Sequence, residues 1–554
     1  MHRKSFKELL QHEFSGYNYA KFYRDFLAGL TVAAVALPLA LAFGVASGAT
    51  APAGLVTAIL GGLIIGGLSG APYQISGPTG AMSAVLVLLA QRHGIQGVWV
   101  AGAMAGVFLL LIGILKLGRF LAFIPSPVIT GFTSGISAII IIGQLENLLG
   151  IKLPGSESAA GKLWNFLQGG WSVNLQSLIA GGLVMLCMLL WPKDWNLKFP
   201  GSLLGLILVT GGVVLLGWPI AHVAEIPSTL LLGDRLTWQS IPWDDLKSLV
   251  APAFSIAALG GIESLLCGAV AANMTGIRLH ANQELIAQGV GNIIIPFFGG
   301  VPATAAIART SVAIKSGGQT RLTSIVHALM LLASIYVLGP IMSRVPLSAL
   351  AGILIITAWR MNEWEEIHYI FKHRLKTAIA SFLLTMAATV SLDLTEAIIL
   401  GTVLSAAVFL SQIAQIDVEL QEIESEKLLE RGIIPPRKCP HTRVAFITGP
   451  LFFAATGHFN EALSGLKDCH VLVLSMRGVP LIDVSGLQAL EHLIEKLSAD
   501  GGTLMLAGVH EDVLATLKRG GLYELIGDKN IFWSSDQAIA AASEKSCRFC
   551  NVLS

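Results

Sequence analysis

The sequence predicts an all-α polytopic membrane domain followed by a small α/β domain, and three observations support this prediction. Hydrophobic residues make up 54% of the chain, charged residues only 13%, and the mean hydropathy is +0.70. These values exclude an ordinary soluble globular protein. Apolar segments of membrane-spanning length recur up to about residue 413, whereas the sequence after about residue 444 is polar with short apolar runs. Finally, two proline-broken stretches, Gly77–Ala81 and Pro302–Ala306, interrupt the apolar part.

Hydropathy divides the chain into five parts in order. These are an N-terminal arm at 1–24, a transmembrane domain at 25–413, a linker at 414–440, an α/β domain at 441–545 and a tail at 546–554. Within the transmembrane domain we predict fourteen spans, at 26–46, 50–69, 79–91, 97–115, 125–144, 176–191, 202–220, 251–272, 283–298, 305–315, 322–340, 346–358, 377–391 and 394–413.

The charges in the loops give the orientation of these spans. Lys and Arg in short loops favour the cytoplasmic side. If the N-terminus lies inside, every predicted inner loop is basic, with Lys116/Arg119, Lys193/Lys198, Arg278/His280, Lys315/Arg321 and Arg360/Lys372/Arg374/Lys376. The charged, amphipathic N-terminus does not resemble a cleaved signal peptide. We therefore expect a protein of the cell inner membrane with both of its termini in the cytoplasm.

The two proline-broken stretches begin the third and the tenth spans. If the fourteen spans form two halves of seven, each stretch begins the third span of its half. Because seven is odd, the second half runs with opposite topology, and the two short helices point their N-termini at each other. A helix N-terminus carries unpaired N–H groups and a partial positive charge, so this arrangement favours an anion. Leu37–Phe43 of the first span could supply apolar walls, although simple packing is an equal alternative.

Two charged residues lie inside predicted spans. Arg309 lies in the tenth span, where a charge costs about 2.5 to 3.5 kcal/mol on insertion scales. We interpret it as part of the anion site; the alternatives are pairing with a carboxylate or reaching towards the cytoplasm. Glu263 is the only charge in its stretch of the eighth span and could hold a cation or a proton. A structural ion pair with Arg309 is an equal alternative, and the two roles are compatible.

The C-terminal part has three strand candidates, at 444–447, 470–474 and 503–506, separated by helical patterns such as 485–497. We expect a small α/β domain in which Ser485 caps the following helix. No catalytic motif or metal cluster appears: the six cysteines include one C-x-x-C at Cys547 and Cys550, without a second ligand pair. We therefore predict no enzyme, no cofactor and, with a net charge of +1, no nucleic-acid partner.

Several of these motifs together resemble the sulfate permease family of anion transporters: Gln74–Ala81, Gly261–Leu266, Gly289–Asn292 and Ala306–Thr310. Val444–Ala540 resembles a STAS domain, with Leu481–Leu487 at its Asp-Ser/Thr-Ser-Gly loop. The resemblance implies a seven-plus-seven inverted repeat split into core and gate domains, elevator-like movement and a homodimer. It also implies small-anion substrates such as sulfate, bicarbonate, chloride or dicarboxylates.

Carried over by position, the resemblance places substrate binding at two groups of residues: Thr79, Gly80 and Ala81 in the third span, and Ile307, Ala308 and Arg309 in the tenth. Sodium-coupled members have an Asp and, four residues later, a Thr in the eighth span, where this chain has Glu263 and Cys267. Since a thiol is a poor sodium ligand, we expect Glu263 to couple transport to protons, with sodium as the alternative. Soluble STAS regulators are phosphorylated on the residue directly after the Asp, which is Val484 in this chain. Regulation by phosphorylation at this position is therefore excluded.

We therefore predict a secondary active transporter for a small anion, embedded in lipid and driven by protons. One alternative is an uncoupled exchanger or channel on the same fold. Another is a membrane-anchored signalling protein whose working part is the STAS domain. A nucleobase transporter would share the fold, but Arg309 favours an anion.

Overall fold

The computed structural model describes residues 6–118, 125–154, 159–192, 195, 199–223, 225–227, 229–243, 246–391, 394–414, 416–422, 441–466 and 469–543. The chain divides into two compact units, Met1–Val403 and Leu404–Ser554. Each unit is described by itself.

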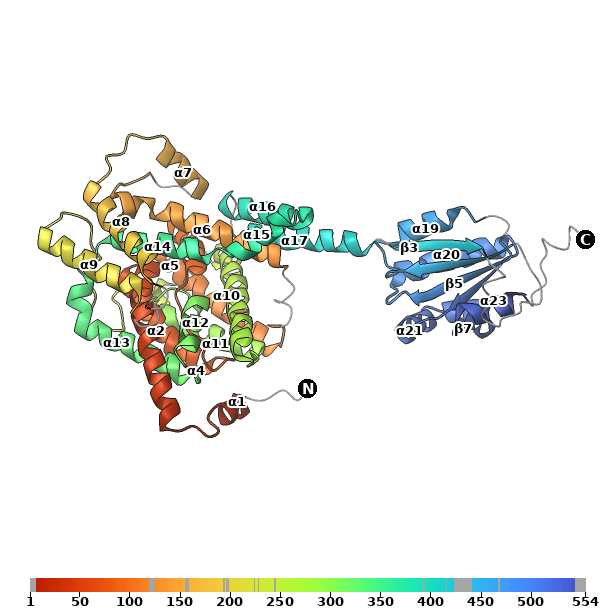
Figure 1. Ribbon diagram of the computed structural model, residues 1–554, viewed down its shortest axis with the longest axis horizontal. Helices are drawn as coiled ribbons and strands as arrows, with labels where there is room; N and C mark the ends of the chain where they lie inside the picture. Colours follow the sequence, from red (N-terminus) through yellow and green to blue (C-terminus); the bar gives the residue numbers. More distant parts are fainter. Residues whose placement is uncertain are drawn as a thin grey trace, which may run out of the picture. The chain divides into compact units, whose positions relative to one another are not determined.

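The first unit is helical apart from two very short strands (Figure 1). Its described helices are α1 (Phe6–Glu13), α2 (Tyr19–Ala46), α3 (Ala51–Leu60), the π-helix η1 (Gly61–Ile65), α4 (Gly66–Leu68), α5 (Gly80–Ile114), α6 (Ser126–Leu149), α7 (Ala159–Leu167), α8 (Leu175–Leu190), α9 (Gly201–Leu216), the short 3₁₀-helix η3 (Trp238–Ser240), α10 (Leu246–Thr275), α11 (Ala281–Ile294), the 3₁₀-helix η5 (Ile295–Phe298), α12 (Ile307–Lys315), α13 (Leu322–Met342), α14 (Leu347–Met361), α15 (Trp364–Lys372), α16 (Lys376–Ser391) and α17 (Leu394–Ile413), which continues into the second unit.

Each of the predicted span ranges contains a helix, although the third and fourth ranges share α5, which is interrupted only by the non-helical Gly94 (φ 69°). Six helical segments in the described part of the chain are long and apolar enough to cross a membrane: Tyr19–Ala46, Ala51–Leu68, Gly80–Ile114, Ser126–Leu149, Leu246–Thr275 and Leu322–Met342. That all fourteen ranges cross the membrane stays a prediction. Of the charges used for orientation, Arg119, Lys193 and Lys198 lie outside the described residues.

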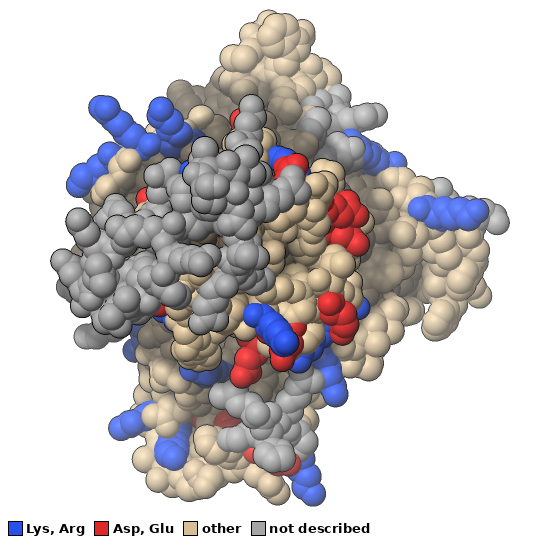
Figure 2. Space-filling model, turned by 90° about the vertical axis from the view of Figure 1, so that its right-hand side faces the viewer, with Lys and Arg blue, Asp and Glu red and all other residues tan. Residues whose placement is uncertain are grey.

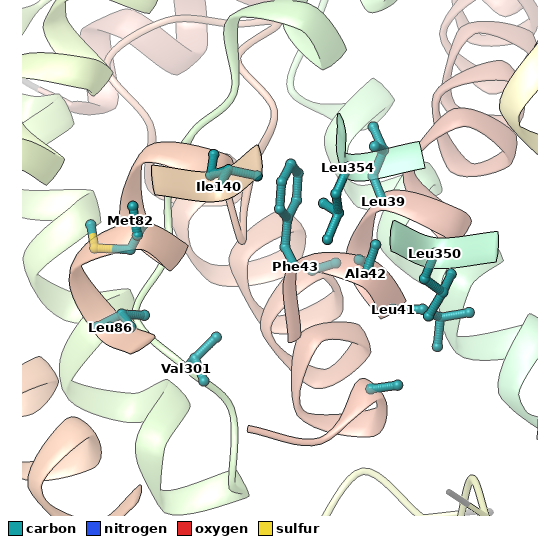
Figure 3. Packing of buried hydrophobic residues seen from close by; sticks show 14 of the residues in the cluster. Leu39, Leu41, Ala42, Phe43, Met82, Leu86, Ile140, Val301, Leu350 and Leu354 are labelled. Atoms are coloured by element: carbon teal, nitrogen blue, oxygen red, sulfur yellow. The ribbon is translucent and has the colours of Figure 1, made fainter. Parts of the chain in front are cut away.

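The helices of the first unit pack as two groups. In one group, α5 packs on α10 and α11, and α2 packs on α3, α12 and α13. In the other, α6 packs on α14 and α16, and α8 packs on α9 and α14. Helix α2 also contacts the second group, and in Figure 3 its Phe43 lies near Ile140 of α6 and Leu354 of α14 in one buried apolar cluster. The two groups therefore meet along α2.

The two proline-broken stretches form a small antiparallel pair of strands. β1 (Ser76–Gly77) pairs with β2 (Thr304–Ala305), with Ser76 opposite Ala305 and Gly77 opposite Thr304. Ala306 N–H also donates to the Ile75 carbonyl at 2.8 Å. Backbone hydrogen bonds thus join two segments that are distant in sequence, and each strand leads directly into a helix that follows it.

The second unit is built on a five-stranded sheet with the order β3-β4-β5-β6-β7. β3 (Asp417–Glu422) is antiparallel to β4 (Thr442–Thr448), whereas β5 (Val471–Gly478), β6 (Thr503–Ala507) and β7 (Ile531–Phe532) follow β4 in parallel. Alternate strand residues face opposite sides, so one face packs against α19 (Thr456–Ser464), α20 (Val484–Ala499), α21 (Glu511–Arg519) and α22 (Leu522–Ile526), and the other against α23 (Ser535–Ser543).

The start of α20 differs from the prediction. Asp483, not Ser485, caps this helix, because the Asp483 side chain accepts from the Gly486 N–H at 2.9 Å. The other carboxylate oxygen of Asp483 accepts from the Phe453 N–H at 3.0 Å, which fixes the preceding loop. Ser485 lies in the first turn instead. Among the residues drawn in colour in Figure 2, both basic and acidic side chains lie on the face in view.

Candidate functional site

The pairing of β1 with β2 brings the first turns of α5 and α12 close together. Helix α12 has nine residues, so it is about 13 Å long at 1.5 Å per residue, less than half the thickness of a bilayer core. Its N-cap is Ala306, which provides no side-chain hydrogen bond to the helix. The first N–H groups of α12 therefore keep their capacity to bind an acceptor.

The first turn of α5 is arranged differently. Thr79 is its N-cap, and the Thr79 hydroxyl oxygen accepts from the Met82 N–H at 3.4 Å. The same hydroxyl donates to Glu263 of α10 at 3.0 Å. The two half-helices are therefore unequal: α5 is capped by its own chain, whereas α12 is not.

Arg309 lies in the first turn of α12, and only 1% of it is exposed. Its Nη2 donates to the Pro78 carbonyl at 2.5 Å, which ties α12 to the other proline-broken stretch. Its Nη1 is buried and has no hydrogen-bond partner within the described part of the chain. A buried donor without a partner costs about 1 to 3 kcal/mol, and more when it is charged. An anion bound beside Nη1 would remove this cost.

A polar network on α10 and α11 holds both proline-broken stretches in place. The Ser264 hydroxyl lies 2.9 Å from the Thr304 hydroxyl, and the Ser264 carbonyl accepts from the Gln74 amide at 2.9 Å. The Asn292 side chain pairs with both the N–H and the carbonyl of Ala303, at 2.7 and 2.9 Å. These side chains are buried, so their hydrogen bonds specify one position for the backbone at the site.

A cavity of about 300 Å³ opens in front of the two half-helices, at the lower end of the size range of small-ligand sites. The helix group of α5 and α12 supplies one part of its lining, and α8, α9 and α14 supply the other part. The lining residues are Val35, Leu39, Phe43, Thr79, Gly80, Glu263, Ala306, Ile307, Ala308, Arg309 and Val312 on the first side and Met188, Pro200, Gly201, Ser202, Thr357, Arg360 and Met361 on the second.

Most of the residues expected at the site thus lie around one cavity. Thr79, Gly80, Ile307, Ala308 and Arg309 line it, as does Glu263. Ala81 does not; it is 6% exposed and packs in the apolar cluster behind the first turn of α5. Of the first span, Leu39 and Phe43 supply apolar wall, as the sequence suggested.

Glu263 and Arg309 do not form an ion pair in this structure. Glu263 accepts from Thr79, and Arg309 donates to Pro78. The two charges face the same cavity and lie close enough to interact electrostatically. Both side chains therefore remain available to a ligand or a proton in the cavity.

Arg360 is the charged residue of this cavity that the sequence does not place there. The loop-charge pattern predicts that it lies in an inner loop, with Lys372, Arg374 and Lys376. In the structure it lies in the last turn of α14, lines the cavity, and donates from Nη2 to the Met188 carbonyl at 2.6 Å. Each of the two helix groups therefore contributes one arginine to the lining of the cavity.

No cluster of three or more His, Cys, Asp and Glu side chains that could hold a metal ion occurs among the residues with described positions. Cys267, at the position discussed for sodium, is 1% exposed, and its thiol donates to the Thr310 hydroxyl at 3.3 Å. Cys547 and Cys550 lie outside the described residues.

Comparison with known proteins identifies the family to which this site belongs. The sequence model of the sulfate permease family matches residues 22–388, which is more than half of the chain. The chain belongs to the sulfate permease family. The model of the STAS domain matches residues 436–538. Members of the sulfate permease family are membrane anion transporters rather than enzymes, and the STAS domain of the family is cytoplasmic.

Individual relatives of this sulfate permease family member agree with that assignment. YvdB of Bacillus subtilis, whose name assigns it provisionally to sulfate transport, is 34% identical over 95% of this chain and 98% of YvdB. The bicarbonate transporter BicA of Picosynechococcus is 28% identical over 94% of both chains. The structure of murine Slc26a9, an anion transporter in the inward-facing state, covers 98% of this chain and 96% of Slc26a9 with a TM-score of 0.84 and 19% identity. This last likeness confirms the fold.

Proposed function

We propose that this chain is a secondary active transporter that binds a small inorganic or organic anion at the first turn of α12. The observation that carries the proposal is the pair of unused donors there: the uncapped N–H groups of α12 and the buried Nη1 of Arg309. Both favour a negative charge, and the residues that carry them, Ile307, Ala308 and Arg309, line the same cavity. Relatives named for sulfate and bicarbonate transport support this ligand class.

Anion uptake into proteoliposomes tests the proposal directly. We expect the purified protein to accumulate labelled sulfate, and unlabelled small anions to compete while neutral solutes of similar size do not. A panel of sulfate, bicarbonate, chloride and dicarboxylates would rank the substrates. Competition by nucleobases rather than by anions would contradict the proposal.

We further propose that transport follows an elevator-like movement of the two helix groups. The cavity lies between them, with Arg309 on one side and Arg360 on the other. The half-helices and α10 are joined by backbone pairing and buried hydrogen bonds, so they are expected to move together. The α14 group would then remain in place while the anion is carried past it.

Two arginines in the lining of one cavity favour a divalent anion over a monovalent one. We expect Arg360→Gln to raise the KM for sulfate about tenfold, the loss expected for one charge-assisted hydrogen bond, and to change the KM for bicarbonate much less. Arg344→Gln, a surface change of the same charge, serves as the control. Equal losses for divalent and monovalent anions would show that Arg360 does not select by charge.

For the driving force, we propose that Glu263 carries the coupling proton. It lines the substrate cavity, and among the described residues Thr79 alone donates a hydrogen bond to it, so its other oxygen can be protonated there. With Glu263→Gln, which keeps the size and the acceptor for Thr79, we expect an imposed inward proton gradient to stop stimulating uptake, while exchange between internal and external anion continues. Comparing uptake at equal pH with and without a sodium gradient tests whether sodium is the coupling ion instead.

The matched control is Glu225→Gln, an exposed carboxylate away from the cavity, which should respond to the proton gradient like the unmodified protein. Stimulation by sodium and not by protons in the unmodified protein would overturn proton coupling. Stimulation of neither kind would favour the uncoupled exchanger. The inner-membrane location, the cytoplasmic N-terminus and the homodimer predicted above also remain proposals.

A further inference from the structure

The N-terminal arm is attached to the transport unit by a buried ion pair. The Glu13 carboxylate contacts Arg321 at the start of α13, with 2.6 Å between Oε2 and Nη2 and with side-chain exposures of 7% and 6%. Glu13 Oε1 also accepts from the Arg321 N–H at 2.7 Å, and the Phe6 ring lies 5.2 Å from the Arg321 guanidinium carbon. Helix α1 is therefore held against the ends of the core helices.

A second attachment lies at Asp25, which is fully buried in α2. Its carboxylate accepts hydrogen bonds from the hydroxyls of Tyr17, Thr320 and Thr323 and from the N–H groups of Gln319 and Thr320, at 2.5 to 3.2 Å. Burial and the hydrogen bond to Asp25 raise the pKa of Tyr17 to about 12, so this phenol stays a donor at neutral pH. The arm and the first turns of α2 and α13 are thus fixed relative to one another.

Between these two attachments lies a cavity of about 400 Å³ that is separate from the transport site. Its charged and titratable lining residues are His12, Glu13, Lys21, Arg278, His280 and Arg321. Glu13 and Arg321 neutralise each other. Lys21 and Arg278 have no ion-pair partner in the parts of the chain that are described, so the cavity has two uncompensated positive charges.

We propose that this cavity, which we call the arm cavity, binds a phosphate group. Lys and Arg side chains that converge on a concave site are suited to phosphate, which offers several acceptor oxygens and a formal charge. The cavity is formed by the arm, by α2 and by the loops before α11 and α13, so a bound phosphate would link the arm to the transport unit. No residue that lines the transport cavity also lines the arm cavity, so the two sites can be tested separately.

Two sources could supply this phosphate, and the surroundings indicate how to distinguish them. Next to Lys21, the first turns of α2 expose Tyr19, Phe22 and Tyr23, at 80%, 41% and 53%. Exposed aromatic side chains at the end of a spanning helix are typical of the interface between membrane and water, where anionic lipid headgroups lie. A soluble phosphate compound would have the same chemistry without needing this surface.

The test measures the thermal unfolding midpoint of the full-length protein in two separate experiments. In the first, the protein in neutral detergent is titrated with inorganic pyrophosphate; in the second, nanodiscs of phosphatidylcholine are compared with nanodiscs containing phosphatidylglycerol. We expect the protein to be stabilised in at least one of the two experiments. In the double variant Lys21→Gln/Arg278→Gln, the apparent Kd for the stabilising ligand should be roughly tenfold weaker. Stabilisation by the lipid alone identifies a headgroup, and by pyrophosphate alone a soluble ligand.

The control is Lys247→Gln/Arg344→Gln, which removes the same charge from two exposed positions outside the cavity. It should keep the stabilisation of the unmodified protein. Amide hydrogen exchange in residues 6–17 provides a second measurement, because the bound phosphate should slow exchange in the arm. No stabilisation in either experiment, or the same response from both double variants, would overturn the proposal.

Discussion

Replacing Arg309 with alanine should abolish anion binding while leaving the protein folded. The change removes the positive charge at the first turn of α12, together with the buried, unpartnered Nη1 of a side chain that lines the cavity. Loss of one partner in a buried, hydrogen-bonded charge pair typically costs about 2 to 5 kcal/mol. We therefore expect the apparent affinity for sulfate to fall by about 100-fold or more, measured by binding of labelled sulfate to the purified protein and by uptake into proteoliposomes.

Arg309→Lys separates charge from geometry in this experiment. Lysine keeps the positive charge but loses the planar fork that lets the guanidinium reach Pro78 and the cavity together. An intermediate affinity is expected, and Arg344→Ala should behave like the unmodified protein. Sulfate binding by Arg309→Ala at the normal affinity would contradict the assignment of the anion site.

Replacing Gly77 with alanine should disrupt the same site without removing any charge. A Cβ on Gly77 would lie 2.7 Å from Nη1 of Arg309 and 3.2 Å from the Cα of Ala58. Because Ala58 belongs to the buried face of α3, only the guanidinium can move away, and it would leave its contact with Pro78. We expect transport to fall at least tenfold, roughly the effect of losing one charge-assisted hydrogen bond.

The matched control is Gly211→Ala in α9, where an added Cβ meets no atom within 4 Å. That variant should transport normally, and its helix should be slightly more stable. Uptake kinetics and thermal unfolding of both variants distinguish a displaced Arg309 from general misfolding. Normal uptake by Gly77→Ala would show that the guanidinium position is not critical.

The helices of the transport unit were predictable because each is a long apolar run with a polar or proline boundary. Pro78 and Pro302 marked the two breaks, and Arg309 stood out because a charge in such a run needs a compensating role. The residues near the site could be found in this way. Their partners could not, because hydrogen bonds such as that from Thr79 to Glu263 join positions far apart in the sequence.

Two features escaped sequence reasoning for identifiable physical reasons. Strands of two residues, such as β1 and β2, are too short to show the alternation that reveals longer strands. Arg360 looks like an ordinary loop charge, because the last turn of a helix is a common place for a basic residue. Only the packing of α14 against the opposite group turns this position towards the cavity.

The pairing of β1 with β2 has a consequence for redesign of this transporter. The strand bonds that join the two proline-broken stretches run between main-chain atoms, from Ser76 and Gly77 to Thr304 and Ala305. These main-chain hydrogen bonds therefore depend little on which side chains occupy the neighbouring positions 307 and 308. Substitutions at Ile307 and Ala308 could then vary the shape of the binding surface while the frame that carries it persists, which makes these two positions a rational starting point for a library selected for new anions.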